Sequence, residues 1–175
     1  MTTWDEIAPD GIREDHERPI AGWRRHASPF SLVAFGVVVA LGLSGLLGHE
    51  RDWHARNGDV EMTIHASQVI RNGEFMELRL RLVSEEPITE PSIGVQASLW
   101  EDLTVNTMIP AATDESSEDG ELRFTFGPID GGVEFLWKVD LQVNPDIVAG
   151  NDGTVTVYDG EEELVSADLS IFVLP

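Results

Sequence analysis

Residues 27–48, ASPFSLVAFGVVVALGLSGLLG, contain no charged side chain. As a helix rising ~1.5 Å per residue, this stretch would extend roughly 33 Å, which matches the ~30 Å hydrocarbon core of a bilayer. A soluble core helix rarely lacks charge on every side, and a cleaved export signal has a shorter apolar part of about 7 to 15 residues. The sequence therefore predicts a transmembrane helix at 27–48. A cleaved twin-arginine signal, processed near Gly42 and Ser44, is the alternative.

The flanks of this stretch have the composition of membrane interfaces. Trp23 and Trp53 bracket it, and Arg24 and Arg25 precede it. Tryptophan and arginine favour the headgroup region, so we expect these four residues at the membrane surfaces. Four arginines precede the stretch and two follow it closely. This bias predicts a bacterial inner-membrane protein with its N-terminus in the cytoplasm and its C-terminal domain in the periplasm.

One face of the predicted helix carries only small side chains. They recur at every fourth residue and so share one side of a helix: Gly36, Ala40, Ser44 and Gly48. Small residues let a second helix approach closely, and packing drives helix association in lipid. We expect this face to bind another integral protein of the same membrane.

The remaining sequence alternates apolar and polar residues. In DVEMTIHA and EFMELRLRLV, which begin at Asp59 and Glu74, apolar side chains recur with a period of two, as in half-buried strands. Asn72-Gly73 between them predicts a hairpin turn, and Asp159-Gly160 predicts another tight turn. Further strands are predicted at 92–99, 121–126, 133–143, 154–158 and 163–173. The pattern predicts an all-β fold, an antiparallel immunoglobulin-like β-sandwich, preceded by one transmembrane α-helix.

We expect four parts along the chain. Residues 1–26 form a flexible cytoplasmic tail, because their first 22 residues are acidic and lack a sustained period. Residues 27–48 form the membrane helix, 49–58 a stem, and 59–175 the exported β-sandwich domain. Within the sandwich, residues 102–120 are predicted to be a long connection, of the kind that is either functional or flexible.

Charge and cysteine content exclude several classes of function. The chain has 32 acidic and 11 basic residues, a formal charge of −21. Nucleic acid is not an expected partner, because its binding requires clustered lysine and arginine. The absence of cysteine excludes disulfides, thiolate metal sites and cysteine nucleophiles. After residue 48, 26 acids face 7 bases, and this charge either keeps the surface solvated or steers a cationic periplasmic partner.

Candidate metal and catalytic motifs fail on spacing. His49 and His54 lie five residues apart, so they do not share a helix face as the zinc-protease motif requires. The acidic segment 114–121 is similar to a calcium loop, but the position that requires a bidentate acid is Phe126. His65 is the one histidine inside the strand domain, where a structural role is more common than catalysis. We expect no metal, no cofactor and no enzymatic activity.

Five segments, RNGEFMELRLRLV, LWEDLTVNTMIPA, VDLQVNP, VTVYDG and LSIFVLP, together resemble a family of bacterial single-pass inner-membrane proteins. The resemblance implies a C-terminal immunoglobulin-like β-sandwich and a role beside other small inner-membrane proteins, and it brings no activity or site residues. We expect an accessory, assembly or stabilising subunit of an inner-membrane protein complex. The alternative is a membrane-tethered periplasmic module that handles a ligand or a metal.

Overall fold

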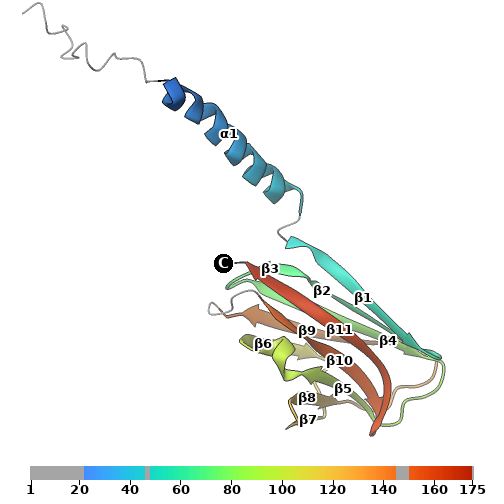
Figure 1. The fold of residues 1–175 in the computed structure, drawn as a ribbon. Helices are drawn as coiled ribbons and strands as arrows, with labels where there is room; N and C mark the ends of the chain where they lie inside the picture. Colours follow the sequence, from blue (N-terminus) through green and yellow to red (C-terminus); the bar gives the residue numbers. More distant parts are fainter. Residues whose placement is uncertain (1–21, 46–47, 145–149, 175) are drawn as a thin grey trace, which may run out of the picture. The chain divides into compact units, whose positions relative to one another are not determined.

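The computed structural model describes residues 22–45, 48–144 and 150–174. The chain divides into two compact units, Met1–Ser44 and Gly45–Pro175. In the described residues, the first unit is one α-helix and the second is a β-sandwich (Figure 1).

Helix α1 (Gly22–Leu43) begins five residues before the predicted membrane helix and ends five residues before its end. Across residues 22–45, 48–144 and 150–174, no helix combines the length and the apolar character that crossing a membrane requires. The predicted transmembrane helix at 27–48 is therefore not supported.

Large apolar side chains on α1 are nevertheless exposed. Phe30 is 75% exposed, Phe35 68% and Leu43 83%. All side chains described on the helix, from Pro29 onward, are exposed. Water is an unfavourable environment for such a surface, since burying apolar area stabilises by ~25 cal/mol per Å².

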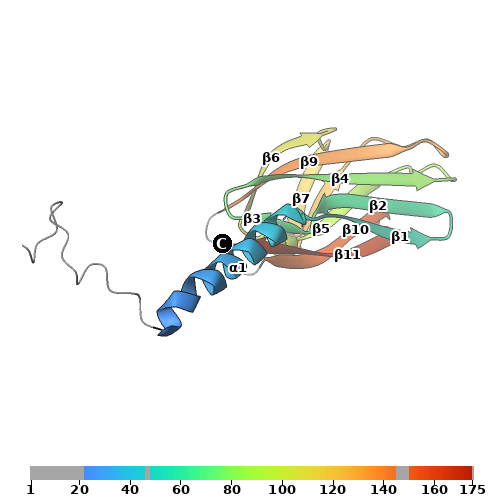
Figure 2. The same cartoon turned by 90° about the horizontal axis from the view of Figure 1, so that it is seen from above.

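In its described part, the second unit contains eleven strands and a short 3-10 helix. The strands are β1 (Glu50–Asn57), β2 (Val60–Ser67), β3 (Val69–Arg71), β4 (Phe75–Ser84), β5 (Pro91–Gln96), β6 (Leu103–Ile109), β7 (Asp114–Glu118), β8 (Glu121–Thr125), β9 (Phe135–Val143), β10 (Asn151–Asp159) and β11 (Glu162–Leu174), and the 3-10 helix η4 is Ala97–Trp100. They form a five-stranded sheet of order β1-β2-β4-β9-β6 and a six-stranded sheet of order β3-β11-β10-β5-β8-β7. Figure 2 shows the two sheets as stacked layers, with β9, β4 and β2 in one and β11 and β10 in the other.

Period-two alternation builds the core between the layers. In β2, Met62 and Ile64 are fully buried while their neighbours stay more exposed. In β4, Leu78, Leu80 and Leu82 are buried in the same way. Alternate side chains of a strand point to opposite faces, so one face of each sheet supplies the core. The predicted β-sandwich is confirmed.

The pairing departs from the predicted turns at one place. β2 and β4 are antiparallel neighbours, as predicted. The chain between them, however, first forms β3, which pairs in parallel with β11 of the other sheet. Asn72-Gly73 therefore joins β3 to β4 and is not the turn of a β2–β4 hairpin. The tight turn at Asp159-Gly160 does join β10 to β11 and is confirmed.

Four strands lie where no strand was predicted, and β3 is one of them. The predicted stem at 49–58 is instead strand β1, which pairs with β2 along its whole length. The predicted connection at 102–120 contains β6 and β7, which are edge strands of the two sheets. No residue of β6 is fully buried and every residue of β7 is exposed, so neither strand shows a clear alternation of buried apolar and exposed polar residues.

Candidate functional site

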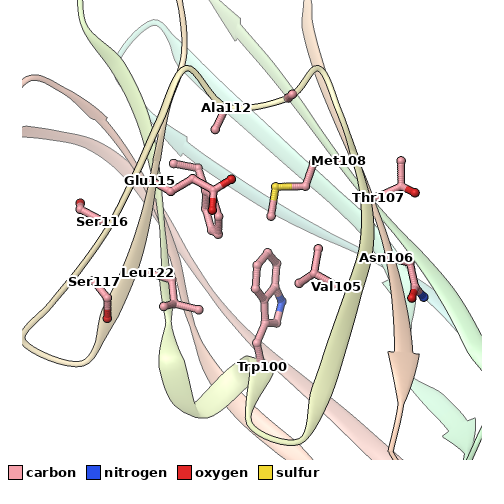
Figure 3. A pocket seen from close by; sticks show the side chains of 12 residues that line it. Trp100, Val105, Asn106, Thr107, Met108, Ala112, Glu115, Ser116, Ser117 and Leu122 are labelled. Carbon is pink, nitrogen blue, oxygen red and sulfur yellow. The ribbon is translucent and has the colours of Figure 1, made fainter.

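The strongest candidate site is a groove between edge strands β6 and β7, with a volume of about 700 Å³. We call it the β6–β7 groove. Figure 3 shows the connection that carries Ala112 at one end of it and Trp100 at the other. β6 and β7 belong to different sheets, so no strand pairing closes the space between them. Its lining includes Trp100, Val105, Met108, Glu115, Leu122 and Phe124.

Aromatic rings form the floor of the groove. Trp100 is 5% exposed and its ring centroid lies 5.5 Å from that of Phe124. The fully buried Trp137 lies 5.4 Å from Phe124 and 6.1 Å from Trp100, again between ring centroids. Tilted aromatic pairs at such separations stabilise each other by about 0.5–1.5 kcal/mol beyond their burial. The floor is therefore a rigid apolar surface.

Strand β6 directs two apolar side chains into the groove. Val105 and Met108 point inward, whereas Asn106 and Thr107 point away (Figure 3). The register of β6 against β9 shifts between Val105 and Thr107. Such a bulge changes the direction of the side chains that follow it. Val105 and Met108 therefore both point inward although they are three residues apart, whereas a regular strand repeats every two.

Trp100 has an unsatisfied hydrogen-bond donor. Its Nε1 atom is buried and has no acceptor in the described part of the chain. Figure 3 shows this nitrogen on the side of the ring that faces Val105. A buried donor without an acceptor costs about 1–3 kcal/mol. The floor of the groove thus contains a buried indole N–H without an acceptor in the described residues.

The rim of the groove on the β7 side is acidic. β7 carries Asp114, Glu115 and Glu118, and every residue of β7 is exposed. The described lining residues include no basic side chain. Glu115 is the one of these carboxylates that lines the groove, because alternation along the strand turns Asp114 and Glu118 to the other face of β7. Its negative charge attracts cationic groups.

Arg123, on neighbouring β8, is already engaged by other groups. Its Nε donates to Glu121 Oε1 at 3.4 Å and its Nη1 lies 3.8 Å from Glu161 Oε2. Its guanidinium carbon also lies 4.1 Å from the ring centroid of Tyr158. Burial, and then the hydrogen bond from its hydroxyl to Glu121, raise the pKa of Tyr158. Arg123 also lines a second hollow together with Glu118, a β7 carboxylate that is outside the lining of the β6–β7 groove.

The acidic segment 114–121 is not a calcium loop. It forms most of the β7–β8 hairpin, in which Glu118 pairs with Glu121. Asp119 and Gly120 form the two-residue turn with φ of 52° and 81°. Positive φ at both positions is typical of a type I′ turn. The Asp-Gly dipeptide was the signal that could have predicted this hairpin and, with it, one wall of the groove.

At the opposite side of the sandwich, Trp53 closes the core. The structure corrects its predicted place at a membrane interface, because Trp53 is 8% exposed and belongs to the hydrophobic core. It lies on β1, and the guanidinium carbon of Arg51 lies 5.5 Å from its ring centroid. A strand directs alternate side chains to one face, and this one faces the core.

His65 is held by two carboxylates of β1. Its Nδ1 lies 2.6 Å from Asp52 Oδ1, and its Nε2 lies 3.2 Å from Glu50 Oε2. The hydrogen bond to Asp52 is the main cause that raises the pKa of His65, and Glu50 adds to it, against a partial loss of hydration. His54 instead contacts Thr63 Oγ1 at 3.1 Å. In the described ranges, no group of three or more His, Cys, Asp or Glu side chains could hold a metal ion.

The predicted helix-packing residues are only partly on one helix. Gly36 and Ala40 lie on α1, whereas Ser44 follows its end and Gly48 lies beyond residues 46–47. Ser44 still donates its backbone N–H to Ala40 at 3.0 Å and its hydroxyl to the Leu41 carbonyl at 2.7 Å.

The predicted interface residues before the apolar stretch are Trp23, Arg24 and Arg25. Their backbone belongs to the first turn of α1, and their side chains lie outside the described residues. Their predicted place at a membrane surface stays a prediction. The predicted flexible tail shares residues 22–26 with α1, and its remainder lies outside the described residues.

No family model and no curated protein matches the chain. Among solved structures, CaCohA2 from Clostridium acetobutylicum is 15% identical with a TM-score of 0.44, over 67% of this chain and 92% of that one. A non-cellulosomal cohesin from the hyperthermophilic archaeon Archaeoglobus fulgidus is 12% identical with a TM-score of 0.39, over 65% of this chain and 91% of that one. None of these comparisons supports the resemblance to single-pass inner-membrane proteins.

Proposed function

We propose that this chain is a non-enzymatic accessory subunit of a bacterial inner-membrane protein complex, attached through α1 and presenting its β-sandwich to a protein partner. The observation that carries the proposal is the exposed apolar surface of α1 between Phe30 and Leu43. Contiguous apolar surface of this kind marks a contact with protein or membrane.

The attachment uses the face of α1 that carries Gly36 and Ala40. Their small side chains let a helix of the complex approach the backbone. Arg24 and Arg25, at the start of α1, favour the cytoplasmic surface. In this proposal the N-terminus lies in the cytoplasm and the β-sandwich in the periplasm.

The β6–β7 groove supports binding rather than catalysis. Of the described residues that line it, Glu115 is the one with a titratable side chain. General acid–base and nucleophilic catalysis require a second group within hydrogen-bond reach of the first. An aromatic floor with an acidic rim is instead suited to holding part of a partner.

Gentle detergent extraction of the tagged full chain from bacterial membranes tests the attachment. We expect an integral membrane protein to co-purify in stoichiometric amount. Ala40→Leu should reduce its recovery at least about fivefold, because leucine blocks close approach of helices. Val38→Leu is the matched control, since residue 38 lies about 200° around the helix from residue 40. Recovery of the chain as a lone soluble monomer would refute the proposal.

A C-terminal fusion to alkaline phosphatase tests the orientation separately. The enzyme is active only after export, so we expect activity in intact bacteria. An inactive fusion of normal abundance would contradict a periplasmic sandwich and leave the helix contact to be judged by the extraction experiment.

A further inference from the structure

The described edges of the two sheets differ in how well they are protected from pairing with another strand. β1 carries charged side chains along its length, ERDWHARN, and β3 has only three residues. β7 is acidic, with the sequence DESSE. Charge and shortness are the usual devices that prevent an edge from pairing with a further strand.

β6 has neither device. Its seven residues, LTVNTMI, include no charge and no proline. It is the outer strand of the five-stranded sheet and pairs with β9 on one side. Val105 is 37% exposed and Ile109 is 59% exposed. An uncharged, apolar edge of this length is a template for β-strand addition.

The β6–β7 groove lies beside this edge. A strand added to β6 would lie about 4.8 Å from it, with every second side chain directed toward the groove. Val105 and Met108 mark that direction, because both point inward (Figure 3). The aromatic floor would receive apolar side chains, and Glu115 of β7 would face the segment across the groove.

We propose that β6 is a strand-addition site that binds an extended segment of a partner protein that turns apolar side chains to the groove and carries a net positive charge. Charge complementarity selects this occupant, because Glu115 lines the groove, the described lining includes no base, and acidic side chains outnumber basic ones in residues 49–175. The proposal adds to the proposed function by naming the chemistry of one partner, and it concerns a surface other than α1.

A second copy of the chain is a poorer occupant of the same edge. Residues 49–175 carry 26 acidic and 7 basic side chains. Pairing two β6 edges would bring two such surfaces together, and like charges repel strongly at short range. A cationic segment instead gains from the same field.

Trp100 provides a local reporter of the bound segment. Its Nε1 donor lacks an acceptor in the described residues and faces Val105. A segment seated beside Val105 lies next to this ring and changes its surroundings. We expect the Trp100 indole N–H resonance to shift on binding, with Trp100→Phe identifying the signal.

The test measures binding of synthetic peptides to the full chain in mild detergent. The probe is a nine-residue peptide that alternates valine and lysine. A peptide that alternates valine and glutamate should bind at least about tenfold more weakly, and binding of the lysine peptide should weaken with salt.

Backbone methylation of the lysine peptide distinguishes strand addition from general charge attraction. Two versions carry N-methyl groups on alternate residues, in opposite phase. A strand directs alternate N–H groups to opposite edges, so one version should lose at least about tenfold in affinity and the other should bind almost unchanged. Equal affinity of the two versions would overturn the proposal.

Val105→Lys on β6 should weaken the lysine peptide at least about tenfold. Phe172→Lys is the matched control, because Phe172 is 51% exposed, lies on β11 of the other sheet and receives the same charge. Circular dichroism confirms that both variants fold. Unchanged affinity in Val105→Lys, or a dimer of the full chain that Val105→Lys dissociates, would refute the assigned occupant. Recovery of the membrane partner through α1 should be the same in both variants, which separates this test from that of the proposed function.

Discussion

β1 and β6 are the two edges of the same five-stranded sheet, and they differ in what they contribute to the hydrophobic core. β1 contributes Trp53 to the core, and the guanidinium of Arg51 lies over that ring. No residue of β6 is fully buried, and the space beside it is the β6–β7 groove. The same sheet therefore has a closed side, which serves stability, and an open side, which is available for binding. Four predictions test this difference, in order of expected size.

Trp53→Ala should have the largest effect. Removing a buried tryptophan leaves a cavity that its neighbours fill only partly, so the free energy of unfolding should fall by about 3–5 kcal/mol. Urea unfolding of the full chain in mild detergent, followed by far-UV circular dichroism, measures the change. A loss below about 1 kcal/mol would mean that β1 does not close the core.

Arg51→Ala should destabilise by about 0.5–1 kcal/mol, because the guanidinium lies 5.5 Å from the Trp53 ring centroid. The same unfolding experiment measures it. Arg56→Ala is the control, since Arg56 lies on the same strand and its Nε contacts the Gly58 carbonyl at 3.1 Å instead of an aromatic ring. Equal effects of the two variants would show that the stacked arginine has no special role.

Val105→Ala should change the free energy of unfolding by about 0.5 kcal/mol or less, as for most surface substitutions. Val105 is 37% exposed on the open side, whereas Trp53 is 8% exposed on the closed side. Unfolding in urea checks this value. A loss above about 1.5 kcal/mol would mean that the open side is part of the stabilising core.

The smallest effect should be a pH dependence at the β1 edge. The pKa of His65 is raised by Asp52 first and by Glu50 next. Protonated His65 thus stabilises the fold fully below the unfolded pKa of about 6.5, and the gain is lost as the pH rises through the higher folded value. His65→Gln should cost a few tenths of a kcal/mol more at about pH 5.5 than at about pH 8.5, since the site is partly exposed to solvent. Equal costs at both pH values would exclude the ion pairs as a source of stability.

The sequence predicted the strands that bury one face. β2 and β4 show a clear period of two because Met62, Ile64, Leu78 and Leu80 all enter the core. β7 is exposed throughout, so its sequence DESSE contains no apolar signal. The sequence of β1 did not reveal a strand, because Trp53 is the one large apolar residue among its eight residues and gives no period of two.

The candidate groove was harder to predict than the fold. Trp100, Met108 and Phe124 line the groove but come from three separate elements, η4, β6 and β8. Local periodicity does not reveal which edge strands face each other across two sheets. Recognition of Asp119-Gly120 as a hairpin turn would have supplied the β7 wall, and the absence of charge in LTVNTMI would have marked β6 as an unprotected edge.

The parallel pairing of β3 with β11 has a consequence for biogenesis. Val69 pairs with Phe172 and Arg71 with Leu174, about a hundred residues later in the chain. A nascent chain on the ribosome has no partner for β3 until nearly the whole sandwich has been synthesised. Contacts between such distant residues slow folding, so the emerging domain would remain accessible to chaperones until β11 is released.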